Sequence, residues 1–121
     1  MHELAIAIEL VDLAEGEARR HGDVRVLAVR VRLGPLAGVV EDALRFSFDV
    51  AAAGTVLEGA RLEIEHQPLM VWCGPCGQAG EPTTRWERRC PFCDSPAPQL
   101  VSGDALELLS IEICDHAPTD R

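Results

Sequence analysis

Apolar residues in the first half of the chain recur with the two periods that distinguish helices from strands. Between residues 4 and 20 the spacing is three, four and seven, which places side chains on one face of an α-helix. Acidic residues lie away from this face, so the sequence predicts an amphipathic helix. Its apolar stripe consists of Leu4, Ala7, Ile8, Leu10, Val11, Ala14 and Ala18.

A second helix is predicted from about Val40 to Ala53, and three other segments alternate apolar and polar residues. Alternation is typical of a strand in a sheet with one covered face. The alternating segments are residues 24–33, 61–67 and 106–113. In the first of them, Leu27, Val29, Val31 and Leu33 are expected to face inward, between Arg30 and Arg32.

Residues 70–100 have a different composition, with four cysteines, both tryptophans, five of the eight prolines and no sustained apolar period. Such a stretch needs a metal ion to fold. The predicted fold class is α+β: a small mixed sheet with two helices, plus an inserted zinc-ribbon-like module with four cysteines. The predicted domains are an α/β domain of residues 1–69 and 104–114 and a zinc-binding domain of residues 70–103.

The cysteines of this module form two identical steps, Cys73-x-x-Cys76 and Cys90-x-x-Cys93, with thirteen residues between them. Each step lets two thiolates face one ion, and the second step closes a tetrahedron, the geometry of structural Zn(II). Four thiolates could also hold iron. The fifth cysteine, Cys114, is expected to be a free thiol.

The string Trp72-Cys73-Gly74-Pro75-Cys76 is also that of a thioredoxin active site. In that fold a helix follows the first cysteine and lowers its pKa. Here Gly77-Gln78-Ala79-Gly80-Glu81-Pro82 follows, which does not favour a helix, and a dithiol enzyme has no role for a second cysteine pair. The redox hypothesis is therefore disfavoured.

Composition and charge indicate what the core is made of and which classes of partner are disfavoured. Hydrophobic residues make up 47% of the chain and aromatic residues 4%, so the core must be aliphatic. The net charge of −9 gives no general attraction to nucleic acid or to anionic lipid, although Arg85, Arg88 and Arg89 lie in the cysteine-rich loop. No apolar run is long enough for a membrane span, and no secretory signal is recognisable. Cysteines in metal spacing favour the reducing cytoplasm.

The sequence begins Met1-His2-Glu3, which offers a second metal site. The α-amine of Met1, the amide nitrogen and imidazole Nδ1 of His2, and the amide of Glu3 can complete a square plane of four nitrogens. Such planes favour Ni(II) or Cu(II). No Ser/His/Asp arrangement, Gly-rich phosphate loop or spaced carboxylate pair stands out, so the sequence predicts no catalytic centre.

Several segments, taken together in the order in which they follow one another along the chain, resemble the hydrogenase nickel-insertion accessory proteins, the HypA/HybF family. The resemblance covers about residues 1–113. It is carried by Met1-His2-Glu3-Leu4, Gly34-Pro35-Leu36-Ala37-Gly38-Val39, Ala43-Leu44-Arg45-Phe46-Ser47-Phe48, Gly59-Ala60-Arg61-Leu62 and the two Cys-x-x-Cys steps.

This resemblance implies a small nickel metallochaperone, not an enzyme, with a structural zinc ion. It implies that Met1, His2 and Glu3 bind Ni(II) as transient cargo for the [NiFe]-hydrogenase large subunit. The implied partners are a nickel-handling GTPase and, in some organisms, urease maturation proteins. The family commonly has an acidic residue at the position of Val40, where Glu41 or Asp42 could substitute. The alternative is a zinc-ribbon binding module for nucleic acid or protein without a nickel role.

Overall fold

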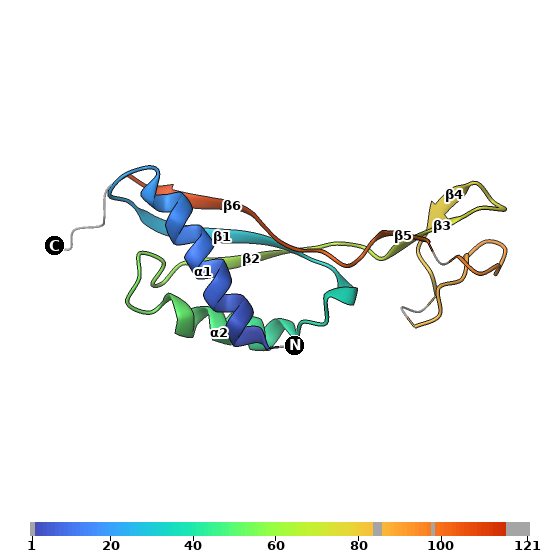
Figure 1. The fold of residues 1–121 in the computed structure, drawn as a ribbon, viewed down its shortest axis with the longest axis horizontal. Helices are drawn as coiled ribbons and strands as arrows, with labels where there is room; N and C mark the ends of the chain where they lie inside the picture. The colour runs from blue at the N-terminus through green and yellow to red at the C-terminus, as the bar shows by residue number, and fades with distance from the viewer. Residues whose placement is uncertain (1, 84–85, 98, 116–121) are drawn as a thin grey trace. The chain divides into compact units, whose positions relative to one another are not determined.

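The computed structural model describes residues 2–83, 86–97 and 99–115 of the 121-residue chain (Figure 1). The chain forms two compact units. The first comprises Met1–Val31, Val39–Ile64 and Leu108–Arg121, and the second comprises Arg32–Gly38 and Glu65–Glu107. Over the described residues the fold is α+β with two helices, a small sheet and a four-cysteine cluster, as the sequence predicts, and it has a second small sheet in addition. The predicted division into domains of residues 1–69 with 104–114 and of residues 70–103 is a statement about which parts fold independently, and it stays a prediction.

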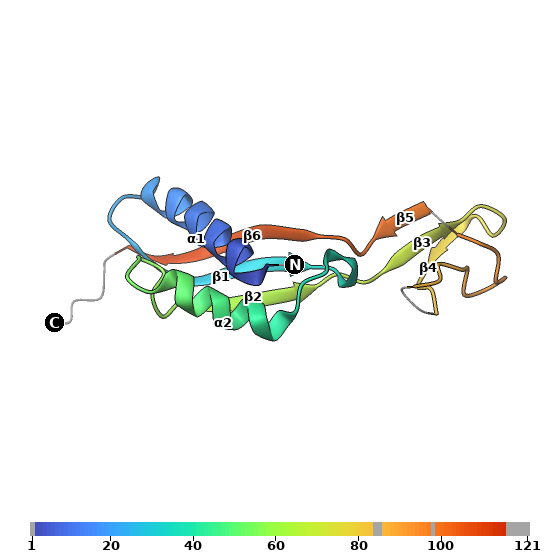
Figure 2. The ribbon, with the colours of Figure 1, turned by 60° about the horizontal axis from the view of Figure 1, so that its bottom comes forward.

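The first unit is a layer of two helices on one face of a sheet (Figures 1 and 2). It contains α1 (Glu3–Arg19), α2 (Glu41–Ala52) and most of three strands, β1 (Arg25–Leu33), β2 (Arg61–His66) and β6 (Leu106–Cys114), whose order is β2-β1-β6. All five lie within two residues of the predicted segments. Helices and strands share one aliphatic core, in which Phe48 is the largest fully buried side chain.

Two details of the predicted core are wrong. Leu4 and Ile8 are 47% and 48% exposed, because α1 turns the face that carries Ala7, Val11 and Ala14 toward the core. At 3.6 residues per turn, Ile8 lies about 100° around the helix from Ala7. In β1 the buried positions change phase between Ala28 and Val29, so that Leu27 is only half-buried.

Polar side chains connect the three strands of the first sheet. Arg32 on β1 donates to Glu65 of β2 at 2.9 Å and to Glu107 of β6 at 3.0 Å. Arg61 on β2 lies 3.1 Å from Glu112 of β6. These exposed pairs each contribute little to stability; the pair of Arg61 and Glu112 spans the two outer strands of the sheet. In the described part of the chain, no helix is long and apolar enough to cross a membrane.

The second unit holds a smaller sheet of β3 (Met70–Cys73), β4 (Gln78–Gly80) and β5 (Gln99–Ser102), in the order β4-β3-β5. The sequence did not predict these strands, since three or four residues are too short to show a period. A one-turn helix, η1 (Pro35–Ala37), follows β1. The two ends of the cysteine-rich segment lie close together, because the Gln67 Oε1 accepts hydrogen bonds from the amides of Gly103 at 2.8 Å and Ala105 at 3.1 Å.

Two glycines allow the main chain after β1 to lie directly against the segment that leads into β6. The amide of Gly34 donates to the carbonyl of Ala105 at 2.8 Å, and Leu36 donates to Gly103 at 2.8 Å. A Cβ atom at Gly34 would lie 2.2 Å from the carbonyl oxygen of Gly103. That oxygen is main chain and cannot turn aside, so position 34 requires glycine.

We therefore predict that Gly34→Ala destabilises the protein by about 3 kcal/mol, the upper end of the range for an added carbon in a packed site. The matched control is Gly16→Ala in α1, where a Cβ meets no atom within 4 Å. It should stabilise the helix by up to about 1 kcal/mol. Urea unfolding followed by circular dichroism measures both. Equal stability of the two variants would contradict the close approach.

Candidate metal sites

The four cysteines predicted as ligands form one cluster in the second unit. Their sulfur atoms all lie within 4.8 Å of one another, with Cys73 Sγ 3.6 Å from Cys93 Sγ and Cys76 Sγ 3.7 Å from Cys90 Sγ. Four sulfurs placed tetrahedrally at about 2.3 Å from a metal ion are about 3.8 Å apart. All four are free thiols, so the spacing fits a metal site and not a pair of disulfides.

Each pair is held by the same turn. The amide of Gly77 donates to the carbonyl of Cys73 at 2.8 Å, and the amide of Asp94 donates to the carbonyl of Cys90 at 2.9 Å. Gly77 and Asp94 both follow the second cysteine of a pair and both have left-handed φ angles, 65° and 61°. Glycine adopts this conformation without strain and aspartate tolerates it. The common position of these two residues in the sequence was a signal that sequence analysis did not use.

The environment of the thiols differs from one cysteine to the next. Cys73 and Cys90 are buried, whereas Cys93 is exposed. Hydrogen bonds from Ser95 lower the pKa of the Cys93 thiol to about 6, and the neighbouring Cys93 and Cys90 thiols raise the pKa of Cys76 to about 12. A metal ion must therefore displace protons from some of these sulfurs, so its affinity falls as the pH falls.

The structure does not favour the redox alternative. Cys73 ends strand β3, and residues 78–80 form strand β4, so no helix begins near the first cysteine to activate it. Of the loop arginines, Arg89 makes internal contacts: it pairs with Glu87 at 2.9 Å and donates to the carbonyl of Asp94 at 2.9 Å. Arg85 lies outside the described residues.

The predicted amino-terminal site lies at the start of α1. His2 is the N-cap residue and is exposed, and its carbonyl accepts the first helical hydrogen bond, from Ile6 at 3.2 Å. Amides in the first turn of a helix have no carbonyl acceptor within the helix, and the amide of Glu3 donates to its own carboxylate. Met1 lies outside the described residues.

The side chain of Glu3 contacts the start of the second helix. Its Oε2 accepts a hydrogen bond from the amide of Val40 at 2.8 Å, and this bond lowers the pKa of the Glu3 carboxyl. Sequence analysis did not find this contact, which joins residues far apart in the chain. Of the carboxylates proposed to substitute at Val40, Glu41 pairs with Arg45 at 3.1 Å, and Asp42 is exposed in the same turn.

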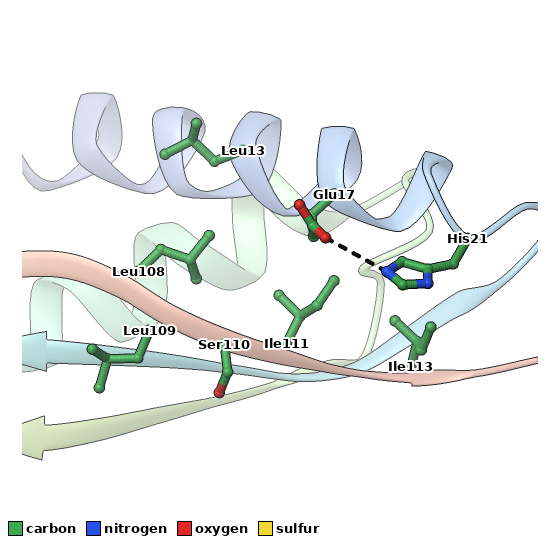
Figure 3. A pocket seen from close by; sticks show the side chains of 8 residues that line it. All are labelled: Leu13, Glu17, His21, Leu108, Leu109, Ser110, Ile111 and Ile113. Atoms are coloured by element: carbon green, nitrogen blue, oxygen red, sulfur yellow. Dashed lines mark ion pairs between the residues drawn. The ribbon is translucent and has the colours of Figure 1, made fainter.

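A groove of about 550 Å³ lies between α1 and β6 (Figure 3). Its side chains are mainly apolar, and Glu17 and His21, which also line it, lie 3.5 Å apart. Among the residues that the structure describes, the four cysteines are the one group of three or more metal-binding side chains close enough to share an ion. The groove is therefore not a metal site of that kind.

The sequence matches the family model described as "Hydrogenase/urease nickel incorporation, metallochaperone, hypA" over residues 1–113. It is 50% identical over 119 residues to the hydrogenase maturation factor HypA of Roseiflexus sp., covering 98% of this chain and 96% of that protein. It is 38% identical over 113 residues to the hydrogenase maturation factor HybF of Salmonella typhimurium, covering 93% and 99%.

Two solved structures have the same fold. The solution structure of the Ni metallochaperone HypA from Helicobacter pylori aligns with a TM-score of 0.64 at 23% identity, covering 93% of this chain and 97% of that one. A second solution structure, of a HypA protein, aligns with a TM-score of 0.68 at 22% identity, covering 96% and 98%. The fold described above is thus found in experimentally determined proteins.

The left-handed turns generate a prediction about metal retention. Gly77→Ala forces an L-residue into a conformation that costs it about 1–2 kcal/mol, so the bound metal should pass to a competing chelator about tenfold faster. Asp94→Gly should release the metal no faster than wild type, because glycine adopts the same φ freely. Transfer of the metal to a coloured chelator measures both rates.

Gly74→Ala is the matched control, since Gly74 lies in the same turn and a Cβ there meets nothing within 4 Å. It should behave as wild type. If Gly74→Ala and Gly77→Ala released the metal equally fast, the turn conformation would not be what holds the site.

Proposed function

The chain belongs to the HypA family of hydrogenase and urease nickel-incorporation metallochaperones, and from this we propose that it binds one Ni(II) ion at its amino terminus for hydrogenase maturation. The observation that carries the proposal is the position of His2, an exposed N-cap residue at the start of α1. The ion is cargo: it is taken up at this end of the chain and passed to the [NiFe]-hydrogenase large subunit.

The proposed ligands are the amine of Met1, the amide and imidazole Nδ1 of His2, and the amide of Glu3. A square plane of nitrogens suits Ni(II). The amide ligands must lose their protons, and the positive end of the α1 dipole stabilises the negative charge that remains on them. Since nickel displaces these protons, its binding should weaken as the pH falls.

The second metal in this proposal is a structural Zn(II) ion held by Cys73, Cys76, Cys90 and Cys93. The sulfur spacings support a tetrahedral ion, and a site with four protein ligands leaves no position for cargo. When bound, the ion supplies folding energy to a segment that buries few apolar side chains. The two metals are thus separated by ligand chemistry, sulfur for zinc and nitrogen for nickel.

The proposed partners follow from the same role. They are a nickel-handling GTPase, the hydrogenase large subunit and, where urease is present, urease maturation proteins. We propose that the chain works in the cytoplasm, where thiols stay reduced and available to zinc. Family membership supports this function over a zinc-ribbon binding module for nucleic acid or protein.

We predict that the zinc-loaded protein binds one Ni(II) per chain with a diamagnetic, square-planar spectrum. Losing a residue that only hydrogen-bonds to a metal ligand typically lowers metal affinity roughly 10–100-fold. His2→Ala removes a proposed ligand itself, so it should weaken nickel binding by more than that. A Ni(II) titration followed by visible absorption and mass spectrometry measures this. His21→Ala, at another exposed histidine, is the matched control and should bind as wild type.

Adding one residue before Met1 should abolish nickel binding and leave zinc in place, because it moves the amine out of the ligand plane. In cells, the extended protein should leave the large subunit unprocessed unless excess nickel is supplied. Undiminished affinity in the extended protein would show that the ligand set is wrong.

Removal of zinc tests its structural role. We predict that chelation, or Cys76→Ala, unfolds residues 70–103, because metal binding supplies folding energy on the order of 10 kcal/mol. Helices α1 and α2 should remain folded, since they have their own aliphatic core. Trp72 and Trp86 report the first change by fluorescence, and circular dichroism reports the second. An ordered cysteine-rich segment in metal-free protein would contradict the assignment.

A further inference from the structure

The carboxylate of Glu3 joins the starts of two helices. Glu3 is the first residue of α1, and its Oε2 accepts a hydrogen bond from the amide of Val40 at 2.8 Å. Val40 is the N-cap of α2, and its own carbonyl accepts the first hydrogen bond of that helix, from Leu44 at 2.9 Å. Neither His2 nor Val40 makes a side-chain cap bond. The Glu3 carboxylate therefore links the first turns of both helices.

We propose that Glu3 is a positioning residue for nickel, and that its carboxylate acts through Val40 and not as a ligand. This inference rests on the proposed function. Chain ends fray unless a contact holds them, and the proposed nickel ligands are the outermost groups of α1. The bond to Val40 holds Glu3, and with it the amides of His2 and Glu3, in the arrangement that accepts the ion.

The expected loss of nickel affinity depends on the fraction of molecules whose amino terminus is ordered for binding. When only a fraction of molecules is competent to bind, the apparent dissociation constant rises by the inverse of that fraction. A charge-assisted hydrogen bond is among the stronger single contacts in a protein. Its loss should therefore lower the competent fraction, and the nickel affinity, about tenfold. The ligand atoms stay the same, so the visible spectrum of bound nickel should not change.

The donor of this bond can be removed without touching Glu3. Val40 has φ −85°, close to the value that proline requires, so Val40→Pro deletes the N–H with little change of backbone. Glu3→Ala deletes the acceptor. Glu3→Gln keeps an oxygen that can accept the bond. Val40→Ala keeps the N–H, and Glu9→Ala removes another exposed glutamate of α1.

The experiment is a Ni(II) titration of these zinc-loaded, full-length variants by visible absorption. Glu3→Ala and Val40→Pro should each bind nickel about tenfold more weakly with the wild-type spectrum, and the double variant should be no weaker than either single one. Glu3→Gln, which keeps a neutral acceptor, should lose less affinity than Glu3→Ala and keep the wild-type spectrum. Val40→Ala and Glu9→Ala should bind as wild type does. Without nickel, Val40 amide exchange followed by NMR should be about tenfold faster in Glu3→Ala than in wild type.

Three results would overturn the inference: unchanged nickel affinity in both Glu3→Ala and Val40→Pro, additive losses in the double variant, or an altered spectrum in Glu3→Gln, which would make the carboxylate a ligand. If Val40→Pro fails to fold, the amide exchange and the nickel affinity of Glu3→Ala still test whether the carboxylate positions the site. The proposed function fails separately, and this inference with it, if wild type binds no nickel or if binding survives His2→Ala.

Discussion

The packing of α1 against the core is the interaction on which the proposed nickel site depends. Three alanines of α1, at positions 7, 14 and 18, are almost fully buried together with Leu10 and Val11. Small buried side chains let a helix approach its neighbours closely, and close packing fixes its position. Because α1 begins at Glu3, fixing the helix also fixes where the first amides lie. A flexible amino-terminal peptide could offer the same nitrogens, but it would have to order them each time an ion bound.

The cysteine-rich segment, unlike α1, is not held in place by a buried apolar core. Within residues 70–97 the buried apolar side chains outside the four cysteines are Val71, Pro82 and Ala97, among the residues that the structure describes there. Burial of three small side chains offsets only a small part of the entropy of ordering the chain. Order must therefore come from turns, from short strands and from the four sulfurs. The repeated left-handed turn at Gly77 and Asp94 explains how each turn brings both of its sulfurs to the same side.

How much the sequence predicts depends on the range of the interaction. Five elements of the first unit were predicted because each carries its own period, and the four cysteines were predicted because their spacing is local. Strands β3 to β5 were not, since they depend on register with one another. The contact between Glu3 and Val40 was also missed, because it needs the tertiary packing of α1 beside α2. Leu4 and Ile8 were wrongly assigned to the core because apolar spacing at a helix start does not show how far the core extends.

Uptake and release of a cargo ion make demands that a structural site cannot meet. Two of the four clustered cysteines are buried, and a tetrahedral ion bound to all four would have no open position. At the amino terminus His2 is exposed, and two of the proposed nickel ligands are main-chain nitrogens that would bind only after losing a proton. A proton can therefore compete with nickel at the proposed site. A carboxylate that orders this site without binding the ion, as proposed for Glu3, would add affinity without occupying a ligand position.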